Sequence, residues 1–204
     1  MNKKELDKLL THEFPVRKNL IYLNHAAVSP LPLRTGEAVK SFVDEYVHLG
    51  TKNYPDWALH ADQLHTDLAQ FVNAASADEI ALLKNTSEGI SVVAMGFPWN
   101  PGDTVVSSDE EFPSNRIPWQ TLAEQGVKFK QVSLRHEGKT PEQSLIDDME
   151  DSTRMLAISA VQYASGLRLD LEILGKACED LEIAFCVDDI QMLCAFPGDV
   201  EAAN

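Results

Sequence analysis

The sequence lacks the features of a membrane or secreted protein. It has only three cysteines among 204 residues and no Cys-x-x-Cys pair, which argues against a disulfide framework or a zinc ribbon. No apolar run approaches the roughly 18 residues of a membrane-spanning helix. The charged start is not followed by the apolar segment of a secretory signal. We therefore expect a cytoplasmic protein with no membrane partner.

Positive charge is also scarce. The chain has 32 Asp and Glu against 17 Lys and Arg, and its formal net charge is -15. Such a charge repels polyanions, so nucleic acid is not an expected partner. The sequence has no Gly-x-Gly-x-x-Gly turn, which a dinucleotide site would need. His60 and His65 lack the His-Glu-x-x-His arrangement of a zinc site, and no metal is expected.

The first third of the chain predicts an arm and helices. A charged opening helix is followed by the apolar run Leu20–Leu23, and Pro30 and Pro32 then favour an extended segment. Apolar residues at helical spacing predict two amphipathic helices, over Val39–Tyr46 and Trp57–Val72.

Short apolar runs alternate with helical stretches in the rest of the chain. This pattern predicts a three-layer α/β/α domain whose mostly parallel sheet is covered on both faces. The expected strands are Ile80–Leu83, Thr104–Ser107, Val127–Val132, Met155–Val161 and Ile183–Val187. Ligands bind at the carboxyl ends of the strands in such sheets, so site residues are expected directly after these runs.

One candidate site segment leads from a predicted strand into a helix. Asn85–Ile90 places the hydroxyls of Thr86 and Ser87 at this junction. A helix N-terminus binds phosphate because its free N–H donors and the positive end of the helix dipole point at the anion. The alternative is that Thr86 or Ser87 simply caps the helix.

A second candidate segment follows the most apolar strand. Asp188 in this position could keep a pyridinium nitrogen protonated, so that the ring acts as an electron sink. Gln191, three residues on, could reach the phenolic oxygen of the same ring. The alternative is a solvated loop that caps a helix.

Two further residues have competing interpretations. Phe112, followed by a proline, could present a flat face to a heterocycle or could belong to the core. Arg168 could bind an anion, but a surface salt bridge with Asp170 is the favoured interpretation.

In this order and spacing, the motifs resemble those of the class V aminotransferase and cysteine desulfurase superfamily of fold-type I pyridoxal-phosphate enzymes. The similar segments are Tyr22–Ala27, Asn85–Ile90, Glu111–Trp119 and Val187–Gln191. The resemblance implies pyridoxal 5′-phosphate (PLP) as cofactor. It assigns Thr86 and Ser87 to the phosphate, Phe112 to the ring face, Asp188 to the pyridine nitrogen, Gln191 to the ring oxygen and His25 to the substrate entrance.

The resemblance also implies a reaction class. The desulfurase branch generally has histidine where Phe112 stands, so the chain is most similar to the isopenicillin N epimerase-like and aminotransferase-like members. The implied substrate is an amino acid or related amine, and the implied assembly is a homodimer of the full-length protein. Cysteine desulfurase or lyase activity, or an inactive binding or oligomerising remnant, stays the alternative.

The resemblance has consequences for the domains and for catalysis. It implies an N-terminal arm and opening helix over residues 1–33, and a PLP-binding large domain over 34–204 that is incomplete at its C-terminal end. The family's Schiff-base lysine would lie beyond Asn204, because Lys176 precedes Asp188 on an apparent helix. Without that lysine we expect the chain alone to be inactive in transamination.

Overall fold

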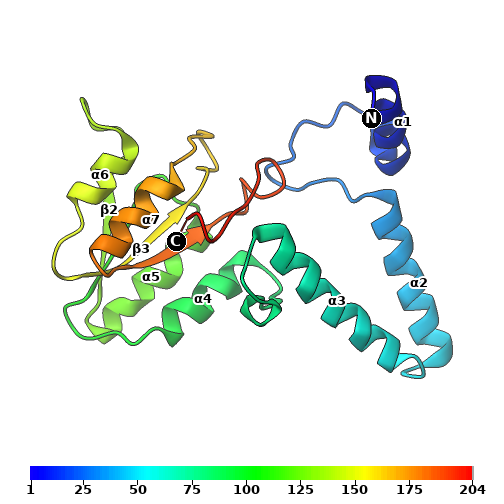
Figure 1. Ribbon diagram of the computed structural model, residues 1–204, viewed down its shortest axis with the longest axis horizontal. Coiled ribbons are helices and arrows are strands. Elements are labelled where there is room, and N and C mark those ends of the chain that lie inside the picture. The colour runs from blue at the N-terminus through cyan, green and yellow to red at the C-terminus, as the bar shows by residue number, and fades with distance from the viewer. Residues whose placement is uncertain (204) are drawn as a thin grey trace. The chain divides into compact units, whose positions relative to one another are not determined.

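The computed structural model describes residues 1–203, which form two compact units (Figure 1). The first unit, Met1–Gln63, contains α1 (Lys3–Glu13), the 3-10 turn η1 (Pro15–Lys18), α2 (Leu33–Leu49) and most of α3 (Tyr54–Val72). The helices expected from the sequence are confirmed, and the chain between η1 and α2 is irregular, as expected of an arm. None of the described helices is long and apolar enough to cross a membrane.

The second unit, Leu64–Asn204, contains a four-stranded parallel sheet with the strand order β2-β1-β3-β4. The strands are β1 (Thr104–Ser108), β2 (Lys128–Val132), β3 (Thr153–Ser159) and β4 (Ala184–Asp188). The helices around them are α4 (Thr86–Gly96), α5 (Ile117–Thr121), α6 (Pro141–Asp147) and α7 (Leu171–Asp180), with the 3-10 turns η2 (Ala77–Glu79), η3 (Pro113–Asn115) and η4 (Leu122–Gln125). The predicted α/β fold with a parallel sheet is confirmed.

One predicted strand does not form. Ile80–Leu83 is irregular and pairs with no strand in the described part of the chain. Leu82 and Leu83 are each 49% exposed, so the apolar run has no layer to pack against. A strand requires a hydrogen-bonded neighbour as well as apolar residues, and here that neighbour is missing.

The core lies on both faces of the sheet, because successive strand residues point to opposite sides. One face packs against α6 and α7 through Val106, Leu156, Ile158, Leu145 and Leu174. The other packs against α4, α5 and η4 through Val105, Met155, Ala157, Ile90, Ala94, Trp119 and Leu122. The two layers of helices hold β1 and β3 in the centre, so the carboxyl ends of these strands are rigid supports for a site (Figure 1).

Candidate functional site

The chain segments that follow β1, β2 and β3 are tied together at the carboxyl edge of the sheet. Arg135 donates from Nε to Glu110 Oε1 at 2.6 Å, and Ser165 donates from Oγ to Glu110 Oε2 at 2.7 Å. The hydrogen bond from Arg135 lowers the pKa of Glu110 below its ordinary value. The segment that carries Phe112 is therefore connected by hydrogen bonds to the segments that follow β2 and β3.

The N-terminus of α4 is capped by Asn85. Asn85 is the N-cap and accepts from Glu88 N at 2.9 Å, so the alternative that Thr86 or Ser87 caps the helix is wrong. Thr86 and Ser87 instead occupy the first turn, where the N–H groups have no intrahelical partner. Ser87 Oγ donates to Ser114 Oγ at 3.1 Å, which brings this helix end to the segment that follows Phe112.

Phe112 lies at the surface and not in the core. Its side chain is 45% exposed, and Pro113 holds the preceding backbone extended. The ring of Phe112 meets that of Tyr163 edge to face, with centroids 5.0 Å apart. Phe112 thus contacts the chain that follows β3, and its ring remains partly accessible.

Asp188 ends β4 and is buried, so the alternative of a solvated, helix-capping loop is wrong. Its Oδ1 accepts from Ile190 N at 3.0 Å, and no regular helix follows in the described residues. Burial raises the pKa of Asp188 above its ordinary value, and the nearby charge of Glu111 raises it further. A carboxylate whose ionised form is disfavoured gains from meeting a cationic group.

The remaining two predicted residues are less closely connected. Gln191 is half-buried in the turn after β4, three residues beyond Asp188. His25 is exposed in the first unit, where its ring meets that of Tyr22 edge to face at 5.3 Å between centroids. The structure thus brings Ser87 to the segment that contains Phe112, and it places Asp188 at the end of β4, paired in register with Ser159 of β3.

The sequence reasoning missed a buried carboxylate in this site. Glu111 is 4% exposed and accepts five hydrogen bonds, three at Oε1 and two at Oε2. The donors are Ser108 Oγ at 2.9 Å, Ser159 N at 2.9 Å, Gln162 Nε2 at 2.8 Å, Asn115 Nδ2 at 3.0 Å and Ser159 Oγ at 2.6 Å. Trp119 Nε1 in turn donates to Asn115 Oδ1 at 3.0 Å. A sequence signal existed only for Glu111 and Asn115, which lie beside Phe112 in the motif.

Arg168 does not form the expected salt bridge with Asp170. Its guanidinium lies 4.7 Å from the centre of the Phe196 ring, whereas Asp170 caps α7 by accepting from Ile173 N at 3.2 Å. The Asp170 carboxylate is used in the N-cap hydrogen bond, and the guanidinium of Arg168 has the face of the Phe196 ring as its partner.

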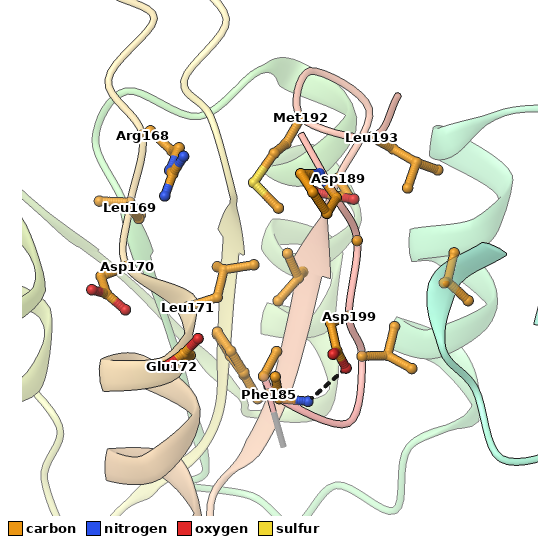
Figure 2. Close-up of a pocket in the computed structure, with 17 residues that line it drawn as sticks. Arg168, Leu169, Asp170, Leu171, Glu172, Phe185, Asp189, Met192, Leu193 and Asp199 are labelled. Atoms are coloured by element: carbon orange, nitrogen blue, oxygen red, sulfur yellow. Dashed lines mark hydrogen bonds between the residues drawn. The ribbon is translucent and has the colours of Figure 1, made fainter. Parts of the chain in front are cut away.

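A cavity of about 560 Å³ lies beside β4 (Figure 2), and none of the residues predicted to bind the cofactor lines it. Phe185, Val187 and Asp189 line it, together with the segment that follows β4. Asp188 does not line it, because alternate strand residues face opposite sides. The cavity is therefore a different surface from the candidate site.

A parallel sheet with a carboxylate at one strand end and a helix N-terminus nearby is the architecture of a cofactor-binding α/β domain. The family model for class V aminotransferases matches residues 21–204. The chain belongs to this family, a group of PLP-dependent enzymes.

Similar proteins and structures come from this family. The chain is 30% identical over 194 residues to a probable cysteine desulfurase of Methanothermobacter thermautotrophicus, covering 93% of this chain and 48% of that protein. It is 25% identical over 190 residues to an uncharacterized aminotransferase of Schizosaccharomyces pombe, covering 92% and 47%. The apo cysteine desulfurase of Thermococcus onnurineus superposes with a TM-score of 0.79 at 26% identity, covering 97% and 50%. The chain thus spans about half the length of these relatives.

A further solved structure supports the fold alone. A C-DES mutant with glycine covalently linked to its PLP cofactor superposes with a TM-score of 0.85 at 22% identity, covering 95% of this chain and 53% of that one. The fold predicted from the sequence, that of fold-type I PLP enzymes, is confirmed.

Proposed function

We propose that this chain supplies the PLP-binding part of an enzyme that acts on an amino acid or a related amine, with aminotransferase or epimerase-like chemistry. The observation that carries the proposal is Asp188, a buried carboxylate at the carboxyl end of β4 whose pKa is raised by burial. A protonated pyridine nitrogen is a cation of the kind that such a carboxylate favours. The similarity to cysteine desulfurases and aminotransferases supports the same cofactor.

The residues at the sheet edge fit this cofactor. Thr86 and Ser87 offer hydroxyls and free N–H groups at the positive end of α4, which suits a phosphate. Phe112 offers an accessible ring, and Gln191 follows Asp188 closely enough in sequence to share its ligand. His25 is assigned to the substrate entrance in this proposal.

When bound, PLP supplies an electron sink that stabilises negative charge developing at the substrate's α-carbon. Asp188 would hold a proton on the ring nitrogen, and this proton makes the ring a stronger electron acceptor. Phe112 would cover one ring face and exclude water from it, and Thr86 and Ser87 would fix the phosphate end. These residues would orient and polarise the cofactor. The groups that contact the substrate would determine which reaction takes place.

The proposal is tested by titrating the purified protein with PLP and following the cofactor's absorbance. We expect saturable binding, and about tenfold weaker binding for Asp188→Ala, since one ionic hydrogen bond is lost. Asp151→Ala is the control, because Asp151 is exposed in the turn that precedes β3, at the opposite end of that strand from the site. Equal affinities of the wild-type protein and Asp188→Ala would contradict the role of Asp188, and absence of binding would contradict the proposal.

Cysteine desulfurase activity is the second candidate, favoured by the names of several relatives, including a cysteine desulfurase of Yersinia pestis at 29% identity over 191 residues. The alignment covers 90% of this chain and 47% of that protein. Phe112 stands against this candidate, because desulfurases generally have histidine there. Formation of alanine from cysteine in the presence of PLP and a thiol reductant, which carries the released sulfur away as sulfide, would favour desulfuration, and amino-group transfer to a keto acid would favour the first candidate.

A further inference from the structure

Glu111 is a charged group that the fold keeps away from both water and cations. Its five donors are neutral, and no Lys or Arg pairs with it in the described residues. Burying a carboxylate is costly even when donors surround it, and a neutral side chain can serve a purely structural role at lower cost. The presence of a charge here therefore calls for a function beyond packing.

The position of Glu111 connects the three strand ends of the candidate site. Its own segment follows β1, and Ser159 and Gln162 belong to the end of β3 and the chain after it. Ser159 is paired in register with Asp188 of β4. One carboxylate thus reaches from the loop that carries Phe112 to the residue opposite Asp188.

The hydrogen bond between Glu111 and Gln162 is adjacent in sequence to the aromatic pair Phe112 and Tyr163. Phe112 follows Glu111 and Tyr163 follows Gln162, so the bond and the ring contact join the same two segments. Moving the Gln162 amide away from Glu111 would change the spacing of the two rings. The carboxylate is therefore placed to control the face that Phe112 offers to a ligand.

Gln162 has an unused acceptor as well. Its side chain is fully buried, and its Oε1 has no hydrogen-bond partner in the described part of the chain. Nε2 is committed to Glu111, and Oε1 is buried without a partner in the described residues. An unpaired buried carbonyl oxygen is costly, and an N–H or O–H donor that came within its reach would remove that cost.

We propose that Glu111 is a positioning residue of the cofactor site, a role that rests on the function proposed above. Its carboxylate fixes Gln162 as an acceptor for a ligand donor, sets the Phe112 ring and places a negative charge near Asp188. The charged or titratable groups coupled to Asp188 in the described residues are Glu111, the adjacent Asp189 and the thiol of Cys186. None of them is a cation, so a bound pyridinium would be the positive partner that this cluster lacks.

The test compares PLP affinity and its pH dependence for the wild-type protein, Glu111→Gln, Gln162→Leu and Asp109→Asn. Glu111→Gln turns an amide N–H₂ toward groups that donate, and we expect about tenfold weaker binding. The loss of affinity at acid pH, which follows protonation of Asp188, should move to lower pH, because removing the Glu111 charge lowers the pKa of Asp188. Gln162→Leu should weaken binding without moving this acid limb, because it keeps the charge.

The control and the outcomes separate this inference from the proposed function. Asp109→Asn removes one negative charge at an exposed position of the loop that contains Glu111. It should change neither the PLP affinity nor the pH at which that affinity is lost. Thermal unfolding of each variant shows whether the fold is retained. Wild-type affinity and an unmoved acid limb in Glu111→Gln would overturn the inference alone. Absence of PLP binding by the wild-type protein would overturn both.

Discussion

Asp188 shows at the scale of one residue how a site is built at a cost in stability. It lies at the end of β4, where burial and the charge of Glu111 disfavour its ionised form. Its pKa in the folded protein is above that in the unfolded chain. Its contribution to stability is therefore present below the ordinary pKa of an aspartate and is lost as the pH rises through the folded-state value.

The first prediction concerns Asp188→Asn. The amide keeps an acceptor for Ile190 N but removes the charge, so at neutral pH the variant should be more stable by about 1 kcal/mol. This advantage should disappear as the pH falls through the folded-state pKa of Asp188. Urea unfolding at several pH values measures the difference. A variant that is less stable than the wild-type protein at neutral pH, but equal to it at acid pH, would show that the charge has a stabilising partner.

Only those residues of the candidate site that lie in short sequence motifs could be predicted from the sequence. Asp188 and Phe112 stand in recognisable short motifs, and the structure places Asp188 at a strand end and Phe112 just beyond one. Glu111 and Gln162 are 51 residues apart, and their bond exists only because β1 and β3 are neighbours in the sheet. No local pattern indicates which of the many acids of this chain meets that amide.

The stability of α4 depends on the residue that caps its N-terminus. Asn85 caps the helix through a single side-chain bond to Glu88 N. Asn85→Ala should cost about 1 kcal/mol of stability, a typical effect of losing an N-cap. Asn85→Asp, which keeps an acceptor, is the control and should retain stability. Chemical denaturation of both variants provides the comparison, and equal stability of Asn85→Ala and the wild-type protein would contradict the role of the cap.

The third prediction concerns the turn that leads into β2. Gly126 has φ +81°, and an added Cβ would lie 3.1 Å from Pro101 Cβ. Gly102 has φ +100°, but a Cβ there would have no atom within 4 Å. Both Gly→Ala substitutions strain the backbone by about 1 kcal/mol or more. Only Gly126→Ala should add a steric contact, so its melting temperature should be the lower one. Equal melting temperatures would show that the Pro101 loop moves away at no cost.

A strand could be predicted from the sequence where an apolar run also has a neighbouring strand to pair with. β1, β3 and β4 lie within or near the apolar runs expected to form strands, because buried parallel strands read as continuous apolar stretches. Ile80–Leu83 has the same composition and is irregular, since composition does not specify a hydrogen-bonded neighbour. The salt bridge expected for Arg168 failed for a related reason, because Asp170 was already used as a helix cap.

At the scale of the whole molecule, the two units differ in how much each buries internally. α1 and α2 contain no buried residue, whereas every residue of β1 and six of the seven in β3 are buried. Local opening is easiest where few apolar contacts have to be broken. We expect amide hydrogens of α1 and α2 to exchange much faster than those of β1 and β3.

Hydrogen exchange followed by mass spectrometry measures this difference, with the exposed but sheet-paired β2 as an internal control. β2 should exchange more slowly than α1, because its amides are in a ladder with β1. Phe42 and Tyr46 of α2 contact the ring of Trp57 in α3, yet both remain about half exposed, so the apolar face of α2 is only partly covered within its own unit. Protection of α2 equal to that of β3 would mean that this face is covered in solution. Repeating the measurement at several protein concentrations would then reveal whether a second copy covers it.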